Sequence, residues 1–228
     1  MKKFISLLLV LSLVFCFAAC GGNETPVGND DNSVVNNEVD NSDENNTITG
    51  NKEITLEDLE NAPVSPESDF HYYDVEGGIE VAYDGDDEIV VIPETIDGKK
   101  VVAISRRGFV NAKKVRAVKL ADSIEVIGDN AFLDHPSIEI LAAGTGLETI
   151  GYCAIGGCNN LKVLELNEGL KKIDVAGIVR NPLLTEIYIP GSVVDPKGLS
   201  PENAVIICEK GSAAEEYAKN NGYEYRLK

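Results

Sequence analysis

Two cysteines and a histidine in the middle of the chain could carry covalent chemistry. Cys153 and Cys158 follow His135 within one short stretch. An imidazole that removes a thiol proton creates a nucleophile, and two neighbouring cysteines can form a disulfide. The sequence offers no third group to orient such a pair, so packing at turns is the main interpretation, with a Cys153–Cys158 disulfide and a thiol enzyme as alternatives. We therefore predict no catalytic residues and no enzyme activity.

A cluster of acidic residues could supply oxygen ligands to a metal ion. Asp84, Asp86, Asp87 and Glu88 surround Gly85. A calcium-binding loop also needs a bidentate acid at its far end, which this stretch lacks. The two histidines of the chain have no partners at zinc-ligand spacing. The main interpretation is a polar hairpin tip, and we predict neither a metal nor a cofactor.

The N-terminus has the features of an export signal. Lys2 and Lys3 precede an uncharged run over residues 4–19, which is shorter than the roughly 20 residues that span a membrane. The run ends in Phe17-Ala18-Ala19-Cys20-Gly21, which resembles the lipobox of bacterial lipoproteins. The resemblance implies that residues 1–19 are a lipoprotein signal peptide and that Cys20 is lipidated. An ordinary signal peptide and an uncleaved anchor are the alternatives.

Residues 20–66 have the composition of an unfolded segment. Residues 21–52 contain nine asparagines, seven acidic residues and no aromatic residue. Such a segment cannot bury enough apolar surface to fold, so we expect a disordered, acidic, Asn-rich stalk. Near its end, Thr55 to Leu59 has the spacing of a capping box and predicts one helical turn, which Pro63 and Pro66 end.

The charge balance excludes some partners. The chain has 38 acidic and 20 basic side chains, for a net charge of −18. Residues 21–66 hold 11 acidic residues and one basic residue, and residues 67–228 hold 27 and 17. Nucleic acid and anionic lipid head groups require a basic face, so neither is an expected partner. We expect contact with the membrane only through the lipid anchor on Cys20.

Apolar residues recur at intervals of 23 through residues 101–194. A unit this short cannot bury its apolar face alone, so about four copies must stack as a solenoid. In each copy an L-x-x-L-x-L segment predicts a strand, a second segment returns across the coil, and a turn brings a large apolar residue to the centre. The six columns are Val115, Ile138, Leu161 and Leu184; Val118, Leu141, Leu164 and Ile187; Leu120, Ala143, Leu166 and Ile189; Val101, Ile124, Leu147, Leu170 and Val193; Ile104, Ile127, Ile150 and Ile173; and Phe109, Phe132, Ile155 and Ile178.

The segments on either side are expected to cap the solenoid. Residues 67–100 predict a β cap, with a hairpin over residues 79–92 that turns at Asp84-Gly85 and a small insertion at Asp97-Gly98. Residues 195–228 predict a second cap. It contains a strand over residues 205–208 and a helix that Ser212 begins and Gly222 ends.

Short motifs recur in step with the repeat. They are Ile127-Gly128-Asp129-Asn130-Ala131-Phe132, Ile150-Gly151-Tyr152, Gly157-Cys158-Asn159-Asn160-Leu161, Ile92-Pro93, Ile189-Pro190 and, near the end, Gly211 to Ala218. Over about residues 68–228 they resemble the BspA-type leucine-rich repeat family of bacterial and protist surface proteins. The resemblance implies a β-rich leucine-rich-repeat solenoid with an N-terminal β-hairpin cap and a short C-terminal capping helix. It also implies attachment to host proteins or to other cells.

One face of the predicted solenoid is available to a partner. Ile140 and Val163 are expected to point outward side by side, flanked by Lys119 and Tyr188. Exposed apolar patches often mark partner sites, and the alternative is that a loop or the stalk covers this patch. The candidate partner-binding residues are Lys119, Ile140, Ala142, Val163, Glu165, Glu186 and Tyr188.

The sequence predicts a lipid-anchored recognition or adhesion module at the bacterial cell surface, on the extracellular side of the cytoplasmic membrane. The expected partner is an extracellular protein, a glycan or a neighbouring cell. Five strands span roughly 24 by 17 Å, or about 400 Å², which is half of a usual footprint. Each copy should therefore bind weakly, and many copies should bind by avidity. The alternative is a structural or assembly subunit of an envelope lipoprotein or transporter complex, and the oligomeric state stays open.

Overall fold

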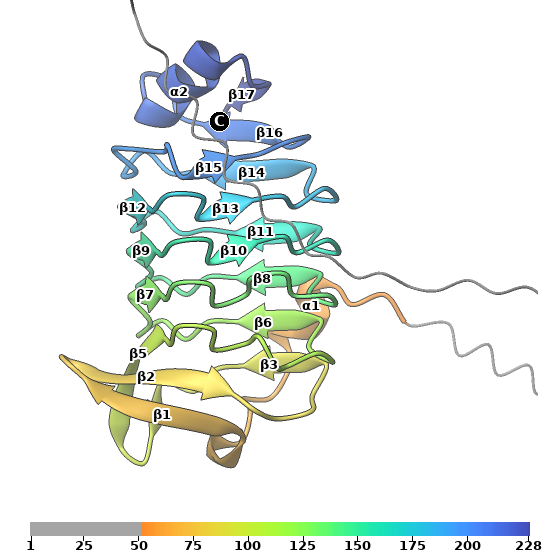
Figure 1. The fold of residues 1–228 in the computed structure, drawn as a ribbon, viewed down its shortest axis with the longest axis vertical. Helices are drawn as coiled ribbons and strands as arrows, with labels where there is room; N and C mark the ends of the chain where they lie inside the picture. The colour runs from red at the N-terminus through yellow and green to blue at the C-terminus, as the bar shows by residue number, and fades with distance from the viewer. Residues whose placement is uncertain (1–51) are drawn as a thin grey trace, which may run out of the picture. The chain divides into compact units, whose positions relative to one another are not determined.

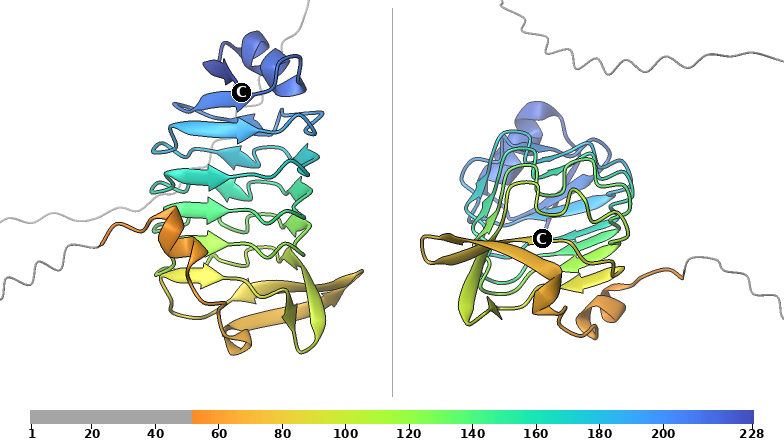
Figure 2. Two further views of the ribbon diagram at one scale, coloured as in Figure 1. Left: turned by 180° about the vertical axis from the view of Figure 1, so that it is seen from behind. Right: turned by 60° about the horizontal axis from the view of Figure 1, so that its bottom comes forward.

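The computed structural model describes residues 52–228 (Figure 1). The predicted signal peptide, Cys20 and most of the predicted stalk lie outside these residues. Within residues 52–228 the chain winds into coils that stack along one axis, and strands of successive coils lie side by side (Figures 1 and 2). No helix in the described part of the chain is long and apolar enough to cross a membrane.

One side of the stack is a parallel sheet in the order β11-β8-β6-β3. Val118 pairs with Leu141, and Leu141 pairs with Leu164, so the 23-residue step of the sequence is the register of the sheet. Between β3 and β6 the step is longer, because Val90 pairs with Val118. The strands of this side are β3 (Ile89–Val91), β6 (Ala117–Lys119), β8 (Ile140–Ala142) and β11 (Val163–Glu165), followed by a second sheet of β14 (Glu186–Ile189), β16 (Val205–Cys208) and β17 (Tyr225–Leu227).

Two further sheets close the coils. One has the order β1-β2-β5-β7-β9-β12, with β4 paired to β5, and the other has the order β10-β13-β15. The first contains β1 (Phe70–Val75), β2 (Gly78–Tyr83), β4 (Thr95–Ile96), β5 (Lys99–Ile104), β7 (Val126–Ile127), β9 (Thr149–Ile150) and β12 (Lys172–Ile173). The second contains β10 (Ile155–Gly156), β13 (Ile178–Val179) and β15 (Leu199–Ser200).

The six apolar columns form the core. Every residue in them is buried except Ala143 and Leu166, which are partly buried and pack against the others. The rings of Phe109 and Phe132 stack with their centroids 4.7 Å apart, and Tyr83 stacks on Phe109 at 5.7 Å. The predicted solenoid is therefore confirmed, and an aromatic stack joins the N-terminal cap to the first coils.

The N-terminal hairpin cap is confirmed, but its position differs from the prediction. β1 and β2 pair antiparallel, and Gly77 lies in their turn with a φ of 84°. The predicted turn at Asp84-Gly85 is wrong, because residues 84–88 connect β2 to β3. β3 pairs in parallel with β6 of the next coil, and a sequence pattern of alternation cannot distinguish this partner from an adjacent strand. The insertion at Asp97-Gly98 is the turn of the β4-β5 hairpin, which lengthens the first coil.

The C-terminal cap agrees with the sequence prediction. Helix α2 (Ala213–Asn221) begins after Ser212, whose hydroxyl accepts a hydrogen bond from the Glu215 amide at 3.2 Å. It ends at Gly222, which has a φ of 72°. Strand β17 was not predicted, and it continues the sheet in parallel beyond β16.

Residues 52–66, which we name the strap, lie on the solenoid, where the sequence predicted the end of a disordered stalk. The predicted capping box is present at the start of α1 (Leu56–Glu60). The Thr55 hydroxyl accepts from the Asp58 amide, and the Asp58 carboxylate accepts from the Thr55 amide. Farther on, the Ser65 amide donates to the Val91 carbonyl at 2.9 Å. The strap then enters the short 3-10 helix η1 (Glu67–Asp69) that precedes β1.

Candidate functional site

The candidate site is the strand face, which we define as the outward-pointing side chains of β3, β6, β8 and β11. The register places Ala117, Ile140 and Val163 in one row across the strands. The adjacent row contains Lys119, Ala142 and Glu165. The prediction that Ile140 and Val163 lie side by side is therefore confirmed by strand pairing.

The strap covers the centre of the strand face (Figures 1 and 2). Leu59 of α1 is 1% exposed and packs with Ala117, Ile140 and Ala142. Ile140 and Ala142 are only 3% and 8% exposed, so the expectation that these two candidate binding residues face solvent is corrected. The physical reason is that the apolar row gains a favourable partner when Leu59, Ile54 and Leu56 remove it from water.

The other candidate residues retain exposure to solvent. Lys119 and Val163 are half-buried, and Val163 packs at the rim of the cluster around Leu59. Glu165 and Glu186 are exposed, and Glu186 accepts a hydrogen bond from Arg226 at 3.0 Å. The open part of the strand face therefore lies toward β11, and its continuation onto β14 carries the acidic side chain of Glu186.

Tyr188 is held by the C-terminal cap. Its hydroxyl lies 2.8 and 2.9 Å from the two carboxylate oxygens of Glu168 and 3.0 Å from Glu209. Lys228 lies over the ring at 4.1 Å and also donates to Glu168 at 3.0 Å. Burial, together with the Glu168 hydrogen bond, raises the pKa of Tyr188 to about 12. This candidate residue is thus oriented by partners within the chain.

A charged network beside the strand face was not predicted. Arg116 donates to Glu139 at 2.7 Å, to Glu88 at 3.3 Å and to the backbone carbonyl of Lys52 at 3.1 Å. Lys162 donates to the other oxygen of Glu139 at 2.9 Å. Burial raises the pKa of Glu139, but the hydrogen bonds from Lys162 and Arg116 outweigh it and keep the pKa below its usual value. The signal was present in the sequence, because positions 116, 139 and 162 are 23 apart and alternate in charge.

His135 and Cys158 do not form a base and nucleophile pair. His135 Nε2 lies 2.9 Å from the Ala112 carbonyl, and Nδ1 accepts from the Ile138 amide at 3.2 Å. Both ring nitrogens are therefore occupied by backbone groups. The Cys158 thiol donates to the Phe132 carbonyl at 3.1 Å, and burial raises its pKa to about 12. A reactive thiol requires the opposite shift.

Asn181 lies one coil after Cys158 at the same position of the repeat, and its polar side chain hydrogen-bonds to the backbone. Asn181 Nδ2 donates to the Ile155 carbonyl, and Asn181 Oδ1 accepts from the Cys158 amide, both at 3.0 Å. His135, Cys158 and Asn181 thus satisfy buried backbone groups between coils. Cys153, Cys158 and Cys208 are free thiols. The Cys153–Cys158 disulfide, which the sequence left as an alternative, is therefore absent.

The acidic residues of the β2-β3 connection bind separate partners. Among residues 52–228, no group of His, Cys, Asp and Glu side chains is arranged to hold a metal ion. Each carboxylate instead pairs with a side chain of a different element. The pairs are Asp84 with His71 at 2.6 Å, Asp86 with Lys114 at 2.8 Å, Asp87 with Tyr83 at 3.2 Å and Glu88 with Arg116 at 3.3 Å.

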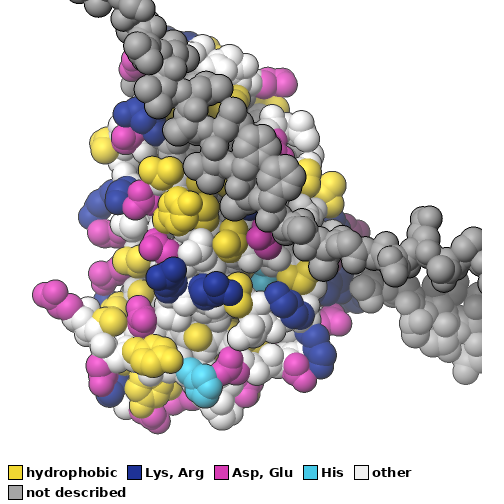
Figure 3. All heavy atoms as spheres, viewed as in Figure 1, with side chains coloured by type: hydrophobic (Ala, Val, Ile, Leu, Met, Phe, Trp, Pro, Cys, Tyr) yellow, Lys and Arg dark blue, Asp and Glu magenta, His cyan; other side chains and the backbone are white. Residues whose placement is uncertain are grey.

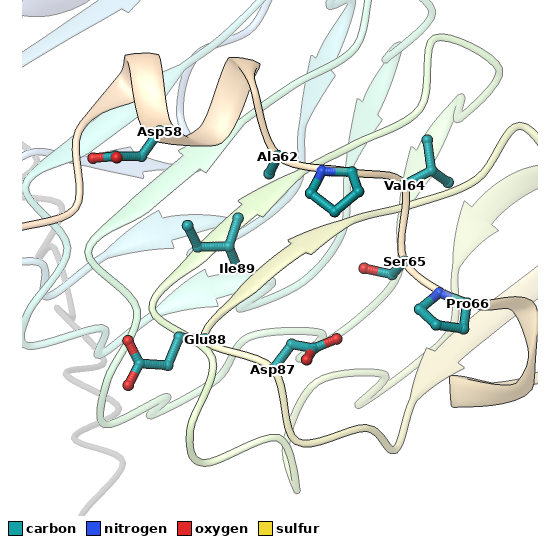
Figure 4. Close-up of a pocket in the computed structure, with 9 residues that line it drawn as sticks. Asp58, Ala62, Val64, Ser65, Pro66, Asp87, Glu88 and Ile89 are labelled. Atoms are coloured by element: carbon teal, nitrogen blue, oxygen red, sulfur yellow. The ribbon is translucent and has the colours of Figure 1, made fainter.

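A hollow of about 370 Å³ lies where the strap passes β3 (Figure 4). Strap residues 62–66 and Ile89 line it, together with Asp58, Asp87 and Glu88. Hydrogen bonds from Lys52 and Thr55 lower the pKa of Asp58 to about 2. None of the predicted binding residues lines this hollow, which the strap and the β2-β3 connection form between them.

Charged side chains of both signs are interspersed over the face shown in Figure 3. Some ion pairs join neighbouring coils at the 23-residue step. Lys171 lies 2.6 Å from Glu148, and Lys162 lies 2.9 Å from Glu139. Where both side chains are exposed, as in the Lys171–Glu148 pair, the contact contributes less than about 1 kcal/mol, so such pairs adjust the surface and the apolar columns hold the fold.

Comparison with known proteins identifies the repeat. The model of the BspA type leucine rich repeat region matches residues 90–196 in six copies, where the apolar columns had indicated about four. A leucine-rich repeat protein from Bacteroides ovatus is 26% identical, with 62% of this chain and 41% of that chain covered and a TM-score of 0.50. No curated protein matches the chain.

Two other solved structures are also similar. A leucine rich cell surface protein from Faecalibacterium prausnitzii is 18% identical, with 65% of this chain and 55% of that chain covered and a TM-score of 0.41. The pneumococcal vaccine antigen PcpA is 16% identical, with 69% and 47% covered and a TM-score of 0.48.

The family match and the fold agree. The matched region begins within β3, the first strand of the strand face, and ends beyond β14. It therefore includes every strand of the candidate site. Leucine-rich-repeat solenoids are typically binding scaffolds without catalytic activity. With their 23-residue register, their buried columns and their six matched copies, residues 90–196 of this chain are a BspA-type leucine-rich repeat region.

Proposed function

We propose that the protein is a lipid-anchored recognition module at the bacterial cell surface, which binds an extracellular protein, a glycan or a neighbouring cell. The observation that carries the proposal is the strand face. Its outward side chains are not needed to fill the core columns, yet they are regular and partly apolar. The family match supports the same function, because a leucine-rich-repeat solenoid presents an extended surface for a partner.

The open part of the strand face is small and chemically mixed. Lys119, Val163 and Glu165 lie beside the strap, and Glu186 and Tyr188 extend the surface toward the C-terminal cap. A usual footprint is about 800 Å² per partner, which is larger than these few side chains provide. Each copy therefore binds weakly, and adhesion relies on many copies on one cell.

We expect substitutions on β11 to weaken multivalent binding. Val163→Asp together with Glu165→Lys changes one half-buried and one exposed side chain of the open face. The apparent affinity should fall by at least about tenfold, because residues at the centre of an interface carry most of its energy. The measurement is binding of protein-coated beads to extracellular matrix proteins, glycans and cells.

The control for this experiment is Glu76→Lys, which reverses an exposed charge in the β1-β2 turn, on a different sheet from the strand face. It should bind as the parent does. If the β11 double variant binds as well as the parent protein, the partner does not use this face.

We expect the lipid anchor to depend on Cys20 alone. Metabolic labelling with a clickable fatty acid should be lost in Cys20→Ala, because the acyl chains need that thiol. Cys16→Ala is the matched control and should keep the label, since Cys16 lies inside the predicted signal peptide. Labelling that persists in Cys20→Ala would exclude the lipoprotein assignment.

A further inference from the structure

The strap presents an amphipathic helix to the strand face. Leu59 is buried, and Ile54 and Leu56 are partly buried against the sheet. Glu57 and Glu60 of the same helix are exposed. The strap therefore meets the face with apolar side chains and leaves its acidic side chains in water.

The apolar positions of the strand face are the positions that the strap contacts. Ala117, Ile140 and Val163 form the row beneath and beside Leu59. At the next 23-residue step the outward residue is Glu186, which is exposed and lies beyond the cluster. The row thus changes from apolar to charged at Glu186, the first position beyond the strap.

Charged side chains surround this apolar contact. The strap contains four acidic residues and one lysine over positions 52–60. Basic residues of β6 and of the segments before β6 and β11 lie around the face, namely Arg116, Lys119 and Lys162. Arg116 also donates a hydrogen bond to the Lys52 carbonyl at 3.1 Å. Arg116 and Lys162 are themselves paired with Glu139, so the contact of these basic residues with the strap is the one with the Lys52 backbone.

The strap is attached so that it can leave as a unit. The backbone hydrogen bonds of α1 stay inside the strap, from Leu59 to Thr55 and from Asn61 to Glu57. Behind the helix, Pro63 and Pro66 flank the contact of Ser65 with Val91. A helix of five residues does not persist alone in water, so docking and helix formation of the strap occur together. Detachment of the strap would therefore unfold its helix and uncover the face.

We propose that the strand face is a docking site for an acidic amphipathic helix of a partner protein, and that the strap is the occupant which such a helix displaces. The proposal rests on the proposed function, because it names the partner class for the same face. The partner carries a leucine at the place of Leu59, acidic residues on the outer side of its helix, and a backbone carbonyl that Arg116 can bind.

The test uses the strap itself as the probe. A fluorescent peptide of residues 52–66, with blocked ends, is titrated with the full chain and with its Leu59→Asp variant, whose strap cannot dock. The variant should bind the peptide at least about tenfold more tightly than the wild type, because the wild-type face is covered most of the time. Glu60→Ala, on the exposed side of the same helix, should behave as the wild type.

Several outcomes would overturn the proposal. Equal peptide affinity for the wild type and for folded Leu59→Asp, or binding of a peptide that itself carries Leu59→Asp, would show that Leu59 does not control the face. A wild-type dimer that forms with rising concentration and is lost in Leu59→Asp would assign strap exchange between copies in place of a partner.

A second measurement on the wild type covers the case in which Leu59→Asp fails to fold. The amides of Leu59 and Asn61 should exchange with solvent at least about 100-fold faster than those of Val118 and Leu141. Equal protection would show that the strap is a permanent part of the fold and would overturn the proposal. Neither experiment needs a natural partner, so their failure would leave the binding result for β11 unaffected.

Discussion

Replacing Phe132 with alanine is expected to lower the free energy of unfolding by about 3–5 kcal/mol. The Phe132 side chain is fully buried and stacks on Phe109 with their centroids 4.7 Å apart. The cavity cannot collapse readily, because parallel strands fix the spacing of the coils on either side. The measurement is urea unfolding followed by circular dichroism.

The matched control for this loss is Phe132→Ile. Ile155 and Ile178 occupy the same column in the following coils and are fully buried there, so this position of the coil accepts isoleucine. We expect the isoleucine variant to lose less than half as much stability as the alanine variant. A loss of similar size in both variants would show that the ring stack, and not the filled volume, stabilises this coil.

Much of the solenoid is predictable because a repeat in sequence is also a register in space. Val118, Leu141 and Leu164 are equally spaced along the chain and pair directly across three strands. The same logic fails for β3. Val90 of β3 pairs with Val118 of β6, which lies 28 residues later along the chain. The step exceeds 23 because the β4-β5 hairpin lengthens the first coil. Periodicity thus locates the partners of regular coils and misses those on either side of an insertion.

The sequence predicted which residues of the candidate site lie side by side across the strands. It did not predict that the strap covers them. Ile140 and Val163 are neighbours for the same reason that the core columns are. Leu59, which buries Ile140, precedes the repeats and lies in a segment dominated by polar residues. Contacts between such remote segments depend on side-chain packing, which spacing alone does not encode. The available signal was the capping box of the strap beside Ile54, Leu56 and Leu59.

Tyr188 illustrates the same limit at the other end of the solenoid. Its outward direction follows from strand alternation, and the structure agrees. Its partner Lys228 is the last residue of the chain and belongs to no repeat. The orientation of Tyr188 therefore depends on how the unpredicted strand β17 adds to β16, which the columns do not specify.

Acidification is expected to destabilise the protein through His135. Its side chain is fully buried, and burial lowers its pKa from 6.5 to about 4, with Lys113 acting in the same direction and the Ala112 carbonyl against it. Below pH 6.5 the unfolded chain binds a proton that the folded protein excludes. The stability present above pH 6.5 is therefore lost progressively as the pH falls toward 4. The expected loss between pH 7 and pH 5 is about 2 kcal/mol, measured by urea unfolding at each pH.

The variant His135→Asn separates this loss from the titration of carboxylates. Asn181 occupies the equivalent place and hydrogen-bonds to the Ile155 carbonyl at 3.0 Å, so an asparagine can replace the imidazole between coils without a group that titrates. Between pH 7 and pH 5 this variant should lose about 2 kcal/mol less of its free energy of unfolding than the parent loses, because carboxylates mostly titrate below this range. If His135→Asn loses as much stability as the parent over this range, the buried imidazole is not its source.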